Sequence, residues 1–405
     1  MIVSRELSWL GVFFTIIIFL TYRSFNQVLF YFSWSAGLLV IILTLGLFIC
    51  YCRFPIIVIK TLSITGLWLF WAVFVTPFST DINHHVNILI ISFYYILASS
   101  LLAFLLTNSS IKKDDVFFLL MTVWVVVNGF LFFLFLIGIY EPVKRDFSGV
   151  FHDRNVFSIT TLIIMAFTLS FGGGSRFWKI FNVFFCVNMI VISKSVTGFL
   201  GLLFLAAFLL NKLSFYKKLI LSFLLIASTV GVLNLDNPLK NRIDRFYMAA
   251  TGNSSQLNNN ESAFIRMYLV TEGISLASEN LFFGVGLDNA RLHIMWPDRN
   301  TGTFLHNTYL DIITSGGVVM FVMYYVPVFL SLLWLLFVRK KIERISLEAY
   351  AFWKSAFLLL ALKILYDFTW TTYFEFVMVF SVVYSVYVSL MLKKILNYEK
   401  NTLHS

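Results

Sequence analysis

The sequence predicts an all-α fold: a polytopic integral membrane protein with about twelve transmembrane helices and a large extracytoplasmic loop that contains short helices. Its composition is the first observation. The chain has 405 residues, of which 60% are hydrophobic, and its mean hydropathy is +0.87. Only 12% of the residues are charged, whereas soluble domains carry about 25%, so a soluble globular protein is excluded. The second observation is that apolar segments near 20 residues long recur along the chain, and a helix of that length crosses a bilayer.

These segments predict the membrane-spanning helices one by one. They comprise residues 7–22, 29–51, 56–78, 87–107, 116–140, 156–172, 179–194, 196–211, 218–234, 317–338, 348–366 and 371–392. The first segment follows Arg5 closely and has no small-residue cleavage site, so we interpret it as a signal anchor. The chain therefore divides into residues 1–234 with nine spans, residues 235–316 as the large loop, and residues 317–405 with three spans and a cytoplasmic tail.

The distribution of basic residues predicts the orientation. With the N-terminus in the cytoplasm, sixteen Lys and Arg fall in cytoplasmic segments and five in the short outer loops. Both termini are then cytoplasmic, and the loop 235–316 faces the outside of the cytoplasmic (inner) membrane. The net charge of +10 reflects this bias rather than nucleic-acid binding. Lipids are the expected surroundings.

Loops of about 80 residues are usually functional, and this one is rich in arginine. Arg266 lies in an apolar helical stretch, and its planar guanidinium suits phosphate oxygens. Outside the loop, Arg154 and Lys194 also face outward in the predicted topology. They could add positive charge around a diphosphate that Arg266 binds. The alternative for these cations is pairing with lipid head groups or local carboxylates.

His306 precedes the tenth span in a stretch that we expect to form a short helix from Gly302 to Ser315. An imidazole titrates near neutral pH and can position or deprotonate a sugar hydroxyl. The alternative is a hydrogen-bonded interfacial histidine, which is the interpretation that we give to His84, His85 and His293.

No metal or cofactor is expected. No pair of histidines has metal-ligand spacing with a carboxylate, and the three cysteines lie in apolar runs. The pair Gly284 and Gly286 has no third glycine and no βαβ context, so it predicts a tight turn rather than a dinucleotide site.

Four motifs occur in a characteristic order. They are Gly149–Asn155 (GVFHDRN), Ser193–Gly198 (SKSVTG), Arg266 with Asn280–Gly286 (NLFFGVG), and Leu305–Leu310 (LHNTYL) with Gly316 and Gly317. Over about residues 145–340 the chain resembles the bacterial O-antigen polymerase and O-antigen ligase superfamily. Its members are integral membrane glycosyltransferases with a large outer loop.

The resemblance implies glycan transfer from an undecaprenyl-diphosphate-linked donor, with inversion at the anomeric carbon and without metal. By analogy His306 and Arg266 are the catalytic residues: Arg266 would bind the diphosphate leaving group and His306 the acceptor hydroxyl. The substrate-binding residues would be Arg154, Asn155, Lys194, Arg291, Asn307 and Tyr309. A chain-length regulator (co-polymerase) is an implied partner.

The predicted function is polymerisation of lipid-linked oligosaccharide repeat units into a surface polysaccharide such as O-antigen or capsule. Ligation of finished glycan to a lipid A core or another anchor is the first alternative. Ligases of this superfamily commonly carry an arginine where this chain has Val196, which favours a polymerase.

A flippase for the same units is the second alternative. It needs polar groups along a path between the two faces. The cations well inside the predicted spans are Lys60, Lys354 and Lys363, and Asp367 is the one evident counter-ion, for Lys363. This disfavours the flippase.

Overall fold

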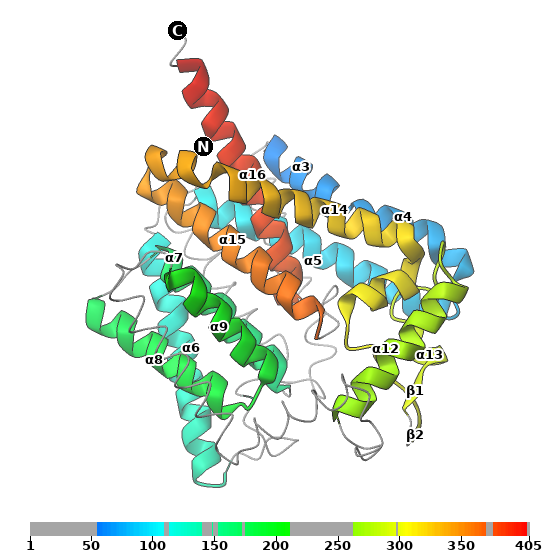
Figure 1. Cartoon of the computed structure of the whole chain (residues 1–405). Helices are drawn as coiled ribbons and strands as arrows, with labels where there is room; N and C mark the ends of the chain where they lie inside the picture. Colours follow the sequence, from blue (N-terminus) through cyan, green and yellow to red (C-terminus); the bar gives the residue numbers. More distant parts are fainter. Residues whose placement is uncertain are drawn as a thin grey trace.

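The computed structural model describes residues 55–108, 113–139, 148, 153–171, 175–210, 262–296, 299–369 and 376–402. The predicted spans 7–22, 29–51 and 218–234 lie outside these residues. The described part is mostly helical (Figure 1). Its helices are α3 (Ile56–Thr65), α4 (Leu67–Val75), η1 (Thr76–Phe78), α5 (Ile82–Asn108), α6 (Lys113–Leu136), α7 (Arg154–Phe171), α8 (Arg176–Ile192), α9 (Val196–Leu210), α12 (Ser262–Glu279), α13 (Ala290–His293), α14 (Thr308–Ile345), α15 (Leu347–Asp367) and α16 (Phe376–Thr402).

Each predicted span that falls on described residues coincides with helix. Within those residues, six helices are long and apolar enough to cross a membrane: α5, α6, α7, α14, α15 and α16. The bent pair α3 and α4 with η1 would make a seventh. The helices α8 and α9 match the predicted spans 179–194 and 196–211 but have only 17 and 15 residues.

The third predicted span is bent by 43°. Gly66 ends α3, and its backbone N–H donates to the carbonyl of Leu62 at 2.8 Å before α4 begins. Pro77 then ends the apolar run in the short helix η1, because proline has no N–H to continue an α-helix. The outer end of this span is thereby turned into a loop that begins at Ser79.

The helices α15 and α16 lie in the centre of the bundle, with α14 and α5 along one side and α7 to α9 along another (Figure 1). Side chains such as Trp353, Tyr384 and Leu359 are buried between them. Large apolar side chains on the outside of the bundle, including Phe70 and Phe337, are exposed. Exposed apolar surface of this kind fits helices that are surrounded by lipid.

The helix α14 is broken at Gly316 and Gly317, where φ is −141° and 73°. Its first two turns fold back over the span that follows, since the rings of Tyr309 and Tyr325 stack with centroids 4.7 Å apart. In a straight helix, 16 residues would separate them by about 24 Å. The helix thus comprises a short outer segment and a long membrane span.

The helix α12, the short helix α13 and the strand pair form a small unit around a separate apolar cluster. The expected helix between Glu261 and Asn280 is confirmed as α12. The strands β1 (Met295–Trp296) and β2 (Arg299–Gly302) pair antiparallel, and the sequence analysis did not predict them. One expectation for this region was wrong. The short helix begins at Thr308 and not at Gly302, because Asn307 caps it there.

Candidate functional site

Two of the sequence motifs meet at the start of α7 and α9. The carboxylate Oδ1 of Asp153 accepts hydrogen bonds from the backbone N–H groups of Asn155 at 2.6 Å and Val156 at 3.3 Å, which caps α7. Ser195 caps α9 in the same way by accepting from the N–H of Gly198 at 3.1 Å. The hydroxyl of Ser195 also donates to Oδ1 of Asn155 at 2.8 Å, so that one contact joins the two caps.

Small residues allow this close approach. The hydroxyls of Ser158 and Ser193 are 2.9 Å apart, and a Cβ atom on Gly198 would lie 2.6 Å from that of Ser158. Arg154 and Lys194 are the chain neighbours of the joined residues Asn155 and Ser195, and Lys194 has a φ of 53°. The structure therefore brings the backbones of Arg154 and Lys194, which were predicted to bind substrate, to the contact between Asn155 and Ser195.

His306 lies just before α14, in a turn and not on a helix face, with a φ of 53°. Asn307 caps α14 by accepting a hydrogen bond from the N–H of Leu310 at 3.1 Å. The hydroxyl of Tyr309 donates to the carbonyl oxygen of Ile364 in α15 at 3.1 Å. The side chains of Asn307 and Tyr309, predicted to bind substrate, thus also fix the turn that carries His306.

Arg266 lies on α12, whose apolar face packs against the segment that precedes His306. Ile265 and Leu269 are buried in the same cluster as Leu305. A Cβ atom on Gly273 would lie 2.7 Å from the side chain of Leu305, so the contact between α12 and this segment is close. The structure brings the helix of Arg266 and the turn of His306 into one unit; convergence of the two side chains on one substrate stays a prediction.

The glycine motifs form a backbone clasp. The N–H groups of Val285 and Gly286 donate to the carbonyls of Thr314 at 2.7 Å and Ser315 at 3.0 Å, beside the break in α14. A Cβ atom on Gly284, whose φ is 65°, would lie 2.4–2.5 Å from the backbone of residues 314–316. The predicted tight turn at Gly284 to Gly286 is confirmed, and its glycines permit contact between two backbones.

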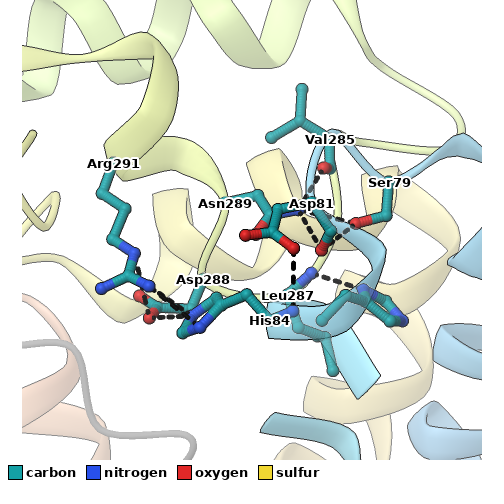
Figure 2. Close-up of polar contacts among 9 residues, drawn as sticks. Ser79, Asp81, His84, Val285, Leu287, Asp288, Asn289 and Arg291 are labelled. Carbon is teal, nitrogen blue, oxygen red and sulfur yellow. Dashed lines mark hydrogen bonds and ion pairs between the residues drawn. The ribbon is translucent and has the colours of Figure 1, made fainter. Parts of the chain in front are cut away.

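A second clasp joins this loop to the loop between η1 and α5 (Figure 2). The amide of Asn289 donates to the hydroxyl of Ser79 at 2.6 Å and to the carbonyl of Asp81 at 3.1 Å. The buried imidazole of His85 accepts from the N–H of Leu287 at 2.8 Å through Nδ1. Its Nε2 faces the carbonyl of Ala72 at 3.0 Å and donates to it. Residues about 200 positions apart are thereby held together.

At the edge of this clasp lies a charged cluster of His84, Asp288 and Arg291 (Figure 2). The Nε2 of His84 is 2.7 Å from Oδ2 of Asp288, and the Nη2 of Arg291 is 2.9 Å from Nδ1 of His84. Because a carboxylate only accepts, Nε2–H donates to Asp288, and the Nη2 of Arg291 lies nearly as close to Nε2, at 3.0 Å, as to Nδ1. Asp288 is 5% exposed, whereas the side chain of Arg291 is 36% exposed.

The surroundings of Asp288 shift the pKa of its carboxyl group. Burial raises the pKa of the carboxyl group above its ordinary value of 3.8, while the hydrogen bond from His84 and the charge of Arg291 oppose that rise. Sequence reasoning missed this cluster. It interpreted His84 as an interfacial histidine, and the partner of His84 lies 204 positions away. The adjacent pair His84 and His85, inside the predicted outer loop between the spans 56–78 and 87–107, was the one local signal.

Within the described residues, no group of three or more His, Cys, Asp or Glu side chains could hold a metal ion. Basic residues in this part of the described chain include Arg154, Lys194, Arg266 and Arg291. Their side chains can donate charge-assisted hydrogen bonds to an anionic group.

A comparison with protein families gives a match over part of the chain. Residues 181–325 match the family described as O-Antigen ligase. The match covers 145 of the 405 residues, and it supports a similarity to the O-antigen ligase and polymerase superfamily. The resemblance expected from the motifs is thereby confirmed. A search of curated proteins gave no match.

The O-antigen ligase match covers α8 to the middle of α14, and so includes Lys194, Arg266, Arg291 and His306. It leaves out Arg154 and Asn155, which reach the matched region through the contact with Ser195. The matched family is glycosyltransferase-like, and together with the apolar helices it supports a multi-pass membrane protein with an O-antigen ligase or polymerase type of function.

Proposed function

We propose that this protein is a polymerase that joins undecaprenyl-diphosphate-linked oligosaccharide repeat units into a surface polysaccharide on the outer side of the cytoplasmic membrane. One observation supports the proposal: the C-terminal end of α15 contacts one of the motifs and lies near a second. Ile364 accepts the hydrogen bond from Tyr309, and Tyr366 lies within electrostatic range of Asp153. The cap beside Arg154 and Lys194 and the turn of His306 therefore lie at the same end of one helix.

The residues at this end of the bundle can supply each role that the proposed reaction needs. The hydroxyl oxygen of the incoming unit attacks the anomeric carbon of the growing chain, and the bond from that carbon to the diphosphate oxygen breaks. His306 takes the hydroxyl proton, and the cations of Arg266, Arg154 and Lys194 neutralise the departing undecaprenyl diphosphate. Attack opposite the leaving group inverts the anomeric centre. Neither a metal nor another cofactor takes part, and Arg291, Asn155 and Asn307 bind the sugars.

The first test is deletion of the gene followed by gel electrophoresis of the surface glycan. Loss of polymerase leaves a single repeat unit on its anchor. Polymer that stays on its lipid carrier would instead indicate a ligase, which the family description favours and the residue Val196 disfavours. Repeat units trapped in the inner leaflet would indicate a flippase. A co-polymerase that sets chain length is a proposed partner of the polymerase.

The second test is His306→Ala in the deletion strain. We expect loss of long glycan chains at normal protein level, because removal of a general base costs about 10²–10⁴-fold in rate. The control is His293→Ala, which removes a half-exposed contact with Thr80 and no proposed catalytic group. Unaltered chain length in the His306 variant would exclude this residue from the mechanism.

A further inference from the structure

A buried ion pair lies at the C-terminal end of α15. The side chains of Lys363 and Asp367 are one helical turn apart, each is 0% exposed, and the ammonium and carboxylate are in contact at 2.5 Å. The hydroxyl of Tyr325 in α14 donates to Oδ2 of Asp367 at 2.8 Å. The ammonium lies 5.0 Å and 5.8 Å from the ring centroids of Tyr324 and Tyr325. The pair is thus enclosed by protein within a membrane-spanning helix.

Stability is a weak explanation for this pair. Removing two charges from water costs several kcal/mol for each ion, and apolar residues of similar volume are often as stable or more stable in such positions. Ionisable groups inside a membrane span are therefore functional by default. The neighbours of the pair show what it acts on.

The contacts lead from Asp367 to the motif that contains His306. The ring of Tyr325 stacks on that of Tyr309 with centroids 4.7 Å apart, and Phe368 contacts the other side of Tyr309 at 4.6 Å. The hydroxyl of Tyr309 donates to the carbonyl of Ile364, in the last turn of α15. Tyr309 is therefore held between the end of α15 and Tyr325.

The break in α14 makes these contacts necessary. Gly316 and Gly317 separate the first two turns of α14 from its membrane span, so the helix itself does not set the direction of residues 308–315. The backbone clasp with residues 281–286 holds one end of this segment. Tyr309 holds the other end, three residues after His306.

We propose that Lys363 and Asp367 are positioning residues: through Tyr325 they hold Tyr309, and thereby the turn of His306, in the geometry that glycosyl transfer requires. This inference rests on the proposed function for its effect on rate. It also predicts a change in the turn that can be measured without any glycan.

The test replaces the pair with apolar residues in the full-length protein, Lys363→Met with Asp367→Leu. We expect a Tm in detergent equal to or above that of the unmodified protein, together with at least a tenfold lower kcat and a KM within twofold. A purely structural pair predicts unchanged kcat at this Tm, and that result would overturn the inference. Tyr325→Phe, which removes only the hydroxyl, should lower kcat in the same direction by a smaller factor.

The matched control is Ser385→Ala. It removes a buried hydrogen bond to the carbonyl of Ala356, also in α15, at 2.9 Å but about two turns from Lys363 and about three from Asp367. Its kcat should stay within twofold of the unmodified value. A tenfold loss in this control would show that any weakened contact of α15 lowers activity, and would contradict a specific role for the pair.

A second readout separates this inference from the proposed function. Phe304 is 41% exposed and lies two residues before His306. In a chain whose cysteines are replaced by alanine, a Phe304→Cys thiol should react with a soluble maleimide at a rate that changes at least threefold when the ion pair is removed. This result supports positioning even if the polymerase assignment fails, whereas an unchanged rate contradicts it.

Discussion

Asp288 has an unfavourable backbone conformation and a buried carboxyl group, and its neighbours stabilise both. Asp288 has a φ of 55° and a carboxyl group that is 5% exposed. A left-handed conformation in a residue other than glycine costs about 1–3 kcal/mol and persists only where the surroundings impose it. Here His84 and Arg291 supply the hydrogen bond and the charge. The same cluster keeps Arg291 partly exposed at the surface of the loop, where it can reach a bound anion.

The Asp288 carboxyl group predicts a pH dependence of stability. Because its pKa is raised in the folded state, that state binds the proton more tightly than the unfolded chain does. Stability therefore falls as pH rises from about 3.8 through the raised pKa, and is level above it. In Asp288→Asn this decline should disappear. The difference in Tm between the two proteins should therefore change by a few degrees over this pH range. Melting curves at several pH values check it; parallel curves would contradict it.

Arg266 gives a second prediction at this scale. If its planar guanidinium binds two oxygens of the diphosphate, Arg266→Lys should reduce polymer formation nearly as strongly as Arg266→Ala, because an ammonium cannot make the same paired contact. Glycan chain length on a gel, at matched protein level, is the measurement. Full activity of the lysine variant would show that only a positive charge is needed.

Among the elements, α14 depends most on local backbone geometry. Gly317 has a φ of 73°, and a Cβ atom there would lie 2.0 Å from the carbonyl oxygen of Phe282. The N–H of Val318 donates to the carbonyl of Leu281 at 2.8 Å directly beside it. Trp71 adds a hydrogen bond from Nε1 to the carbonyl of Gly316 at 2.7 Å. The break in α14 is therefore held by α4 and by the loop after α12.

A comparison of Gly138 with Gly317 distinguishes two causes of strain, a positive φ and a steric clash. Gly138 has a φ of 75° with nothing within 4 Å of its would-be Cβ, whereas Gly317 has both the positive φ and the clash. Gly138→Ala should cost about 1–2 kcal/mol from backbone conformation alone. Gly317→Ala should cost clearly more and lower the Tm further. Equal losses in Tm would mean that the contact with Phe282 relaxes without cost.

The helices could be predicted from the sequence because hydrophobic length alone decides a span. Contacts between distant segments could not. Nothing near Asp288 indicates that His84 is its partner, and nothing near Gly317 indicates that Tyr309 folds back onto Tyr325. The prediction that Asn155 and Lys194 belong to one site rested on family resemblance, and the physical reason for it appears only in the contact between Asn155 and Ser195. Lys363 and Asp367 were recognised as a pair since they lie one turn apart.

For the whole molecule, the two ends of the bundle differ in chemistry. The basic group Arg339, Lys340, Lys341 and Arg344 lies near the C-terminal end of α14, while the turn of His306 lies before its N-terminal end. In Figure 1 the C-terminal part of α16 also leaves the bundle at the top, away from α12, α13 and the strand pair. From the positive-inside rule we expect the basic end to lie in the cytoplasm and His306 outside. A lipid-linked donor would follow from that orientation, since nucleotide sugars are cytoplasmic.

Two cysteines test this orientation in one experiment. In a chain with Cys50, Cys52 and Cys186 replaced by alanine, Leu292→Cys and Tyr398→Cys place thiols at positions that are 44% and 73% exposed, on opposite ends of the bundle. A membrane-impermeant thiol reagent should label residue 292 in intact spheroplasts and residue 398 only after lysis. The reverse pattern would put His84, Arg291 and His306 in the cytosol. The donor would then have no need of a lipid carrier, and the polymerase mechanism proposed here would lose its physical basis.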